Sequence, residues 1–255
     1  MKINNINIYN MYSAVLGIRN SFKSKEKSDS TQVAVSIKSS IDGLVYDCND
    51  FEYLRKKDRT DLWTSYNGCV IGKEDEKMIK RILTGQTPPQ ERKFLRQILV
   101  SMDIIGSIKF YSQHDTFKIA TVRNSESTMH SITKGGLSQE DFEREINFQQ
   151  LEYINSMIES FNGFKEMTDK QFKRWSKSTL FNKGVEKNIY LKELFEKIDA
   201  NLPAGYLLES HWTGNYENMR NIYHSRKNHK MYWWKEFCDY IKKLPYAELL
   251  ITDGE

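Results

Sequence analysis

A long amphipathic helix in the middle of the chain constrains the fold more than any other sequence feature. Apolar residues recur there at helical spacing, at Leu151, Ile154, Ile158 and Phe161. Directly before them, Ser138-Gln139-Glu140-Asp141 has the pattern of a helix N-terminal capping box. A helix with one apolar face must cover that face with other parts of the fold. We therefore expect a packed domain, with this helix opening near Ser138.

Length and composition fit a single domain over 1-255. The 255 residues are 39% hydrophobic and 13% aromatic, enough for one sizeable core. The 38 basic and 34 acidic residues give a formal charge of +4, less than the excess expected when nucleic-acid binding dominates a chain. No run approaches the roughly 20 apolar residues of a membrane span, and the polar start is unlike a signal sequence. We expect a soluble, cytoplasmic protein with no membrane partner.

Cysteine and histidine spacing gives no support to a metal or P-loop mechanism. Cys48, Cys69 and Cys238 are odd in number and lack CxxC spacing, so they indicate neither a disulfide framework nor a zinc site. The five histidines are dispersed, and the HExxH, P-loop and GxGxxG patterns are missing from the sequence. We expect no metal site.

The N-terminal part of the chain combines strand and helix signals. Polar residues over 20–31 predict a mobile loop, and alternating Val33, Val35 and Ile37 predict a short strand. Asn67-Gly68 predicts a turn, and Met78 to Leu83 predict a helix that stops near Gly85.

The same mixture continues further along the chain. A second helix is predicted over 94–99, followed over 100–122 by a strand, a turn at Gly106-Ser107 and a further extended segment. Helical patterns recur near 169–175 and 190–198. The expected class is α/β (α+β), a mixed sheet with long helices.

The segment 215–244 predicts a C-terminal helix with cations on its apolar face. At about 100° per residue, Arg226 and Lys230 fall within about 20° of the middle of the apolar stripe. The stripe consists of Met219, Ile222, Tyr223, Trp233 and Phe237. A buried guanidinium needs an anion. One interpretation is structural: the cations form internal ion pairs, or their charged ends reach solvent at the edge of the stripe. The other is that a ligand supplies the anion.

Two further segments permit both a binding and a structural interpretation. The short donors over 121–130 suit a phosphate or a base edge, but taken alone their composition favours an ordinary turn before a helix. These donors are Arg123, Asn124, Ser125, Ser127, Thr128 and His130. The Trp233-Trp234 pair and the lysines around it suit a single-stranded nucleic-acid surface, or a core with a solvated face.

Three motifs resemble those of the flavin-dependent thymidylate synthases (ThyX), in a divergent form of the kind found in phage-like genomes. The run from Gly85 to Arg92 is similar to the family pattern G-H-x-S-P-x-E-H and keeps its glycine, second proline and glutamate. The run from Lys118 to Ser127 is similar to the end of R-H-R-x-x-S-x-N-x-x-S-x-R, with one residue inserted. Asn124 and Ser127 match that pattern outright, and Lys118 and Thr121 are conservative replacements.

The third motif falls in the family's order and spacing without a gap. It consists of Leu202-Pro203, Trp212-Thr213, Asn215, Asn221 and Arg226. The chain departs from the family at Thr116 and Phe117, which replace an arginine and a histidine, and at Met129 and Asp199, which stand where arginines are expected. The resemblance covers about 72–237.

The resemblance implies a homotetramer that binds FAD, reduces it with NADPH and uses methylenetetrahydrofolate to methylate dUMP at C5 without an enzyme nucleophile. It assigns Arg226, Asn124 and Ser127 to the nucleotide, with Ser125, Arg123 and His130 as further candidates. Toward the flavin it assigns Asn215, Asn221, Arg92, Lys118 and Thr121. We therefore expect one-carbon transfer to a pyrimidine nucleotide. The alternative is a non-catalytic protein that binds a nucleotide or single-stranded nucleic acid through Arg226, Lys230 and the tail aromatics.

Overall fold

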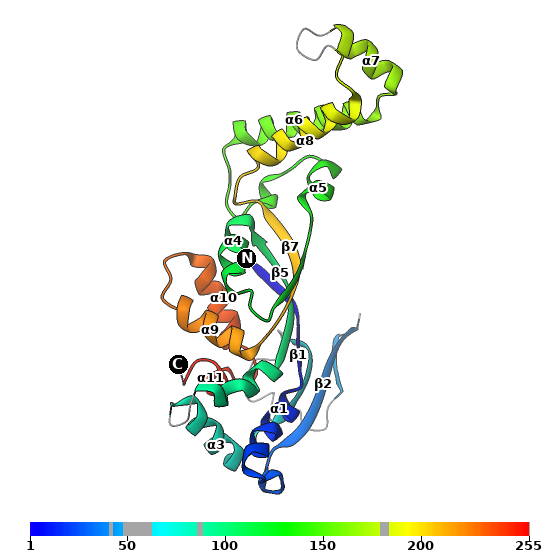
Figure 1. Ribbon diagram of the computed structural model, residues 1–255. Helices are drawn as coiled ribbons and strands as arrows, with labels where there is room; N and C mark the ends of the chain where they lie inside the picture. Colours follow the sequence, from blue (N-terminus) through cyan, green and yellow to red (C-terminus); the bar gives the residue numbers. More distant parts are fainter. Residues whose placement is uncertain (41–42, 48–62, 86–88, 179–183, 255) are drawn as a thin grey trace. The chain divides into compact units, whose positions relative to one another are not determined.

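The chain forms a mixed β-sheet with helices, shown by a computed structural model that describes residues 1–40, 43–47, 63–85, 89–178 and 184–254 (Figure 1). The strands are Lys2–Tyr9 (β1), Thr31–Ser40 (β2), Gly43–Asp47 (β3), Trp63–Val70 (β4), Leu99–Ser107 (β5), Val122–Ser125 (β6) and Leu207–Asn215 (β7). Their order in the sheet is β3-β2-β4-β1-β5-β7-β6. β1 runs parallel to β4 and antiparallel to β5. This mixed sheet confirms the expected α/β (α+β) class.

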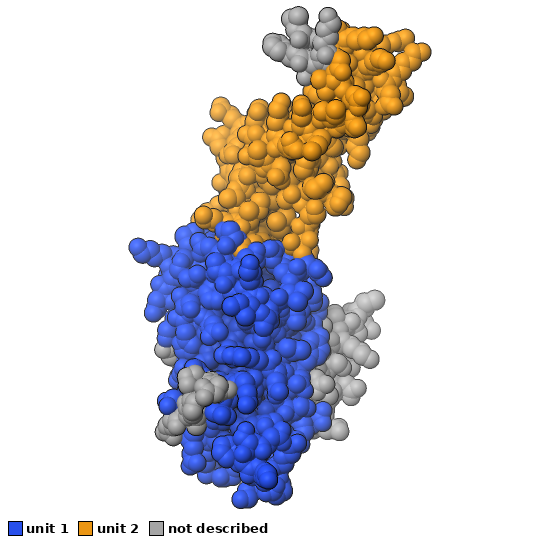
Figure 2. Space-filling model, in the orientation of Figure 1, with its two compact units in different colours: residues 1–105, 112–124, 210–255 blue, residues 106–111, 125–209 orange. Residues whose placement is uncertain are grey.

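Tertiary contacts divide the chain into two compact units (Figure 2). The first unit comprises residues 1–105, 112–124 and 210–255, and the second comprises 106–111 and 125–209. Strands β5, β6 and β7 have residues in both units. The expectation of a single domain over 1-255 stays a prediction.

The core of the first unit lies between β1 and the helices packed beside it. The longer helices of this unit are Met11–Ile18 (α1), Lys73–Leu83 (α3), Tyr216–Arg226 (α9) and Tyr232–Lys242 (α10). Shorter ones are the 3-10 helices Arg19–Phe22 (η1), Lys25–Lys27 (η2) and Pro89–Gln97 (η4), and the helix Ala247–Leu250 (α11). Alternate residues Ile6 and Ile8 of β1 are at most 1% exposed. Helices α9 and α10 lie side by side (Figure 1), and Tyr216, Trp233 and Trp234 are fully buried.

The second unit packs around two long helices, Phe148–Glu166 (α6) and Lys187–Asn201 (α8), with Asp169–Ser178 (α7) at one end of the pair (Figure 1). Its short helical turns are Thr128–Ser131 (α5), Ile132–Lys134 (η6) and Gln139–Asp141 (η7). Ile154 and Ile198 are fully buried, as the apolar spacing of α6 and α8 requires. Helix Ile108–His114 (α4) begins in this unit and ends in the first, where Asp115–Phe117 (η5) follows it.

The predicted strand over 33–37 and the helices over 78–83, 169–175 and 190–198 are confirmed by β2, α3, α7 and α8. Segment 94–99 is a 3-10 helix up to Gln97, not an α-helix, and Leu99 already begins β5. The predicted turn at Asn67-Gly68 is wrong, because both residues pair with β2 inside β4.

The extended segment expected after Gly106-Ser107 is also wrong. Residues 108–114 form α4, whose first turn is capped when the Phe110 amide donates to Ser107 Oγ at 3.1 Å. The capping box at Ser138 is real, with Asp141 as its partner, but it caps only η7. Helix α6 begins ten residues later than Ser138, at Phe148, and Asn147 caps it.

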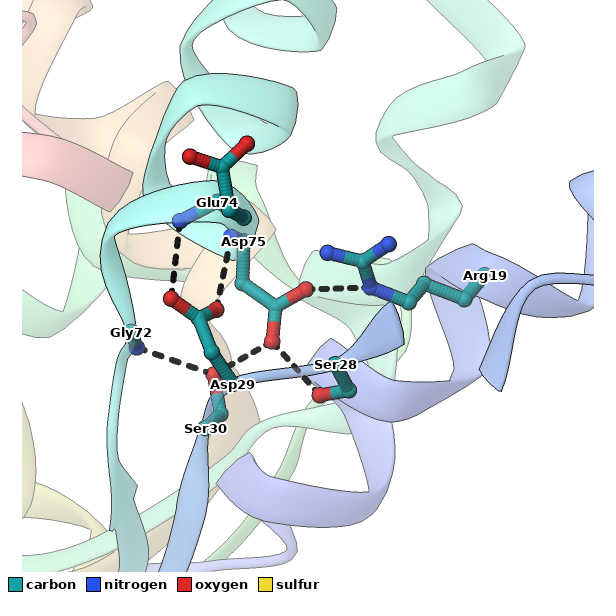
Figure 3. Close-up of polar contacts among 7 residues, drawn as sticks. All are labelled: Arg19, Ser28, Asp29, Ser30, Gly72, Glu74 and Asp75. Carbon is teal, nitrogen blue, oxygen red and sulfur yellow. Dashed lines mark hydrogen bonds and ion pairs between the residues drawn. The ribbon is translucent and has the colours of Figure 1, made fainter. Parts of the chain in front are cut away.

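The polar segment 20–31 holds η1 and η2, and its last residues are fixed to the start of α3 (Figure 3). Asp29 Oδ2 and Oδ1 accept the amides of Glu74 and Asp75 at 3.0 and 3.1 Å. These amides, that of Glu74 most, lower the pKa of the Asp29 carboxyl. The N-cap residue of α3 is Gly72, which has no side chain to accept these amides. Asp29, from a distant segment, therefore caps the helix in its place. A Cβ on Gly72 would lie 2.1 Å from Asp29 Cγ, so only glycine leaves room for this cap.

A buried ion pair adjoins this cap. Arg19 Nε donates to Asp75 Oδ1 at 2.5 Å, and the hydroxyls of Ser28 and Ser30 donate to Asp75 Oδ2 at 2.6 and 2.5 Å (Figure 3). The Asp75 side chain is fully buried and that of Arg19 is 8% exposed. The mobility predicted for 20–31 stays a prediction for its first part, whereas these bonds fix residues 28–30.

Candidate functional site

Helix α9 begins with a cap and ends at Arg226. Asn215 Oδ1 accepts the Asn218 amide at 3.0 Å, and Asn218 Oδ1 accepts the Asn215 amide in return. The oxygen of Asn215 is therefore committed to the helix start, and the residue is only 4% exposed. Met219 and Ile222 turn inward and are fully buried. This phase leaves Arg226 half-buried at the last helical position.

The predicted single helix over 215–244 is in fact two helices. α9 ends at Arg226 and α10 starts at Tyr232, so the helical phase is not carried across residues 227–231. Lys230 is exposed in the connection, and its predicted place on the apolar stripe is wrong. The two tryptophans, Trp233 and Trp234, return to the core at the start of α10.

The guanidinium of Arg226 lies against two aromatic rings, those of Phe117 and Trp234, which also contact each other edge to face with centroids 5.9 Å apart. Its Cζ is 5.1 Å from the ring centroid of Phe117 and 5.1 Å from that of Trp234, within the range of a cation–π contact. Arg226 Nε is buried and has no hydrogen-bond partner among the described residues. No carboxylate of the described chain forms an ion pair with this arginine, so the internal ion pair considered from the sequence is not seen. Because a buried unsatisfied donor is costly, this geometry favours an anionic ligand.

The ring of Trp234 is held in place by residues of α4. Its Nε1 donates to Gln113 Oε1 at 3.0 Å. The His114 ring lies 5.6 Å from that of Trp212 and 5.5 Å from that of Phe237, and it is stacked with Trp234 at 6.3 Å. Burial lowers the pKa of His114 to about 4. His114 is thus neutral at physiological pH and adds no positive charge beside the arginine.

The turn that follows Phe117 is tied to α9. The amide and the hydroxyl of Thr121 both donate to the Lys118 carbonyl, at 3.1 and 2.9 Å. Asn218 Nδ2 donates to the Ile119 carbonyl at 2.9 Å. Asn221 is three residues further along α9, on the same helix face as Asn218, and its side chain is exposed. The turn that holds Lys118 and Thr121 therefore lies beside α9, the helix that carries Asn221.

Two of the proposed nucleotide contacts follow on β6, in the same unit as Arg226. Arg123 Nη2 donates to Asp115 Oδ2 at 2.8 Å, and this ion pair already neutralises part of its charge. Asn124 is exposed. The structure thus brings segment 115–124 and the end of α9 together, although the sequence placed them a hundred residues apart.

The remaining nucleotide candidates follow Asn124 along the chain, and the first of them, Ser125, is still part of β6. Ser125, Ser127 and His130 belong to the second unit, where the Ser127 carbonyl accepts the His130 amide at 3.0 Å. This contact is the helix-opening turn that the sequence offered as the simpler alternative.

Arg92 is half-buried in η4, which the Arg96–Glu217 ion pair, with Nε and Oε2 2.7 Å apart, ties to the first turn of α9. Residues 86–88 of the first motif lie outside the described residues.

Sequence reasoning missed the aromatic and histidine environment of Arg226. Phe117 was recognised only as a departure from the family's histidine, and no pattern pointed to His114 or Gln113. The adjacent Trp233-Trp234 was the one available signal. Both rings are at most 1% exposed, which removes them as a stacking surface for single-stranded nucleic acid.

The described residues offer neither a metal cluster nor a reactive thiol. No group of three or more His, Cys, Asp or Glu in these segments is arranged to hold a metal ion. Burial raises the pKa of Cys69 to about 12 and that of Cys238 to about 11. Both are therefore protonated at neutral pH. None of the helices that the structure describes has the length and apolar character needed to span a bilayer.

The fold is similar to that of solved flavin-dependent thymidylate synthases. Two structures of ThyX from Helicobacter pylori, each complexed with FAD and dUMP, match 100% of this chain and 99% and 100% of their own chains. Their TM-scores are 0.56 and 0.57, at 12% sequence identity in both cases. The chain is similar to ThyX in fold. No protein-family model matches the sequence, and no curated protein is similar to it.

Proposed function

We propose that the protein is a flavin- and folate-dependent enzyme that transfers a one-carbon unit to C5 of a pyrimidine nucleotide, converting dUMP to dTMP as ThyX does. FAD, NADPH and methylenetetrahydrofolate are the proposed cofactors. The proposed assembly is a homotetramer. The fold and the environment of Arg226 support this proposal from two independent directions.

Arg226 is the observation that carries the proposal. Its guanidinium is oriented by Phe117 and Trp234, and its buried Nε lacks a hydrogen-bond partner within the described chain. A planar guanidinium presents paired donors that match a phosphate. The resemblance independently assigns this residue to the nucleotide. Arg226 therefore binds and orients the nucleotide phosphate in the proposed enzyme.

The neighbouring side chains fit a large polar cofactor. Lys118 and Asn221 are exposed and show no side-chain hydrogen bond or ion pair to the described residues. Both remain available to hold FAD, and Arg92 stands on the adjacent η4. Bound flavin would supply the redox chemistry of the reaction. The contribution of Asn215 is limited to its amide nitrogen, because its oxygen caps α9.

The decisive experiment measures nucleotide and flavin binding by the wild type and by Arg226→Ala. The wild type should take up FAD, with an absorption band near roughly 450 nm, and should bind dUMP in calorimetry. Arg226→Ala should lose about 2–5 kcal/mol of dUMP binding, the range for truncating one partner of a desolvated charge pair. Arg226→Lys should also bind weakly, because it keeps the charge but not the fork.

Arg81→Ala, at an exposed arginine on α3, serves as the matched control and should bind dUMP normally. Thermal melting without ligand separates binding from folding. A wild type that binds neither FAD nor dUMP would refute the enzyme. An Arg226→Ala variant that melts much lower yet binds dUMP normally would show that the arginine stabilises the core and does not bind the ligand.

A further inference from the structure

Helix α7 of the second unit concentrates positive charge on one face. Its ten residues, DKQFKRWSKS, include four basic residues and one acidic residue, in a chain whose total formal charge is +4. Lys170, Lys173, Arg174 and Lys177 are all exposed. At about 100° per residue they fall within an arc of roughly 100°. The four cations thus form one row, which we call the α7 basic face.

Folding does not account for this row. Residues three or four apart on a helix are neighbours, so Lys170–Arg174 and Lys173–Lys177 are like-charge pairs that destabilise the helix. None of the four cations forms an ion pair with the described residues. Other helices of the chain place acids and bases at this spacing, as in the Glu76–Lys80 ion pair of α3, with Oε1 and Nζ 2.6 Å apart. On α7, Asp169 is the only acidic residue, and it stands four residues before Lys173.

The opposite face of α7 fixes the row in space. Phe172 is 2% exposed, and its ring packs with those of Phe164, Trp175 and Tyr190 at centroid distances between 5.3 and 6.1 Å. This aromatic cluster anchors α7 to α6 and α8. The apolar side chains are therefore committed to the interior, and the cations are presented on a rigid support.

We propose that the α7 basic face binds the phosphate backbone of nucleic acid, independently of base sequence. A helix that lies on a membrane needs an exposed apolar face, and the apolar face of α7 is buried. A protein partner needs aromatic or apolar anchors, and lysine is depleted at such interfaces. The row spans about 10 Å along the helix. Duplex DNA carries one negative charge per about 1.7 Å of its axis, so a segment of the same length offers enough phosphates for all four cations. This inference does not depend on the proposed enzyme.

The test measures binding of a fluorescent 20-base-pair duplex (about two helical turns) by anisotropy between roughly 50 and 300 mM salt. The test variant carries K170Q, K173Q, R174Q and K177Q. The control carries K93Q, K134Q, K197Q and K235Q, at exposed lysines elsewhere, so both lose the same formal charge. We expect the test variant to bind at least about tenfold more weakly at low salt, with a salt slope shallower by up to about 3.6. The control should match the wild type within about twofold.

Melting curves and two further probes complete the test. The test variant should melt no lower than the wild type, because like-charge neighbours have been removed. Arg226→Ala should bind the duplex normally, which separates this surface from the proposed nucleotide site. The proposal is overturned if the wild type does not bind the duplex, or if the control variant weakens as much as the test variant. It is also overturned if the basic face supports binding only to vesicles containing phosphatidylserine.

Discussion

The buried imidazole of His114 should make stability depend on pH. Its pKa is lowered from the ordinary value of 6.5 to about 4, chiefly by burial, with the Asp115 carboxylate opposing the change and the Arg123 cation adding to it. The unfolded chain therefore binds more protons than the folded chain between about pH 4 and pH 6.5. The stabilising contribution is fully present above pH 6.5 and is lost as the pH falls toward 4.

The size of the loss follows from the two pKa values. Each unit of pKa difference is worth about 1.36 kcal/mol, so the full loss is about 3 kcal/mol. Roughly 2 kcal/mol of this is gone by pH 5, by the linkage relation between protonation and folding. This amount is a large fraction of the typical stability of a domain.

The assay is urea unfolding at pH 7.5, 6 and 5 of the wild type and His114→Phe. Phenylalanine keeps an aromatic ring among Trp212, Trp234 and Phe237 but has no titrating group. The free energy of unfolding of the wild type should fall more than that of the variant, by about 2 kcal/mol between pH 7.5 and 5. His130→Gln, at an exposed histidine, is the matched control and should follow the wild type. Parallel curves for the wild type and His114→Phe would refute the reasoning.

Three substitutions test local packing by urea unfolding at neutral pH. Gly72→Ala should cost about 1–3 kcal/mol, because its Cβ would overlap Asp29 and displace the cap of α3; a neutral result would contradict the cap. Gly163→Ala should instead stabilise the protein by about 0.5–1 kcal/mol, since this helical glycine has nothing within 4 Å of the added Cβ; a loss of stability would count against the position of α6. Asp75→Ala should cost about 3–5 kcal/mol, because it leaves the Arg19 guanidinium buried and unpaired, and a cost below about 1 kcal/mol would show that water replaces the carboxylate.

The elements that the sequence predicted well are those whose pattern depends on one periodic face. Alternation at 33–37 predicted a strand and helical spacing at 151–161 predicted a helix, and β2 and α6 confirm both; in α6, Leu151, Ile154 and Ile158 are buried. The capping signal at Ser138 predicted the turn beside it but not the start of the long helix. Ser138 forms a complete capping box with Asp141, but the box closes a single 3-10 turn. The sequence pattern of a cap therefore marks a turn and does not by itself mark the start of a long helix.

Two errors arose where tertiary contacts override local preference. The β-branched and aromatic residues after Gly106 suggested a strand, yet the Ile108 and Lys109 amides donate to carbonyls of Tyr206 and Ala204, and the chain turns into α4. The capping hydroxyl of Ser107 was the signal for that helix. The break between α9 and α10 had no glycine or proline to mark it, so the pattern beyond Arg226 was extended in the wrong phase.

For a related reason, the sequence predicted Arg226 as a site residue but not the aromatic residues that surround it. Arg226 stood out because a guanidinium on an apolar helix face needs an explanation. Phe117, which lies over it, is 109 residues earlier in the chain, and nothing local links the two. Partners joined only by the fold leave no periodic signal, so aromatic contacts of this kind become apparent only in three dimensions.

The proposed nucleotide site would bind its anion with fewer arginines than the ThyX pattern has. Thr116, Met129 and Asp199 stand where the family has arginines, and the environment of Arg226 is aromatic and partly desolvated. A charge interaction strengthens as the local dielectric falls and as salt is excluded. We therefore expect Arg226, packed against Phe117 and Trp234, to bind an anion more strongly than one fully exposed arginine would. Binding at this site should depend weakly on salt, whereas the exposed row on α7 should depend on it steeply. Ionic strength therefore separates the two anion-binding surfaces proposed for this protein.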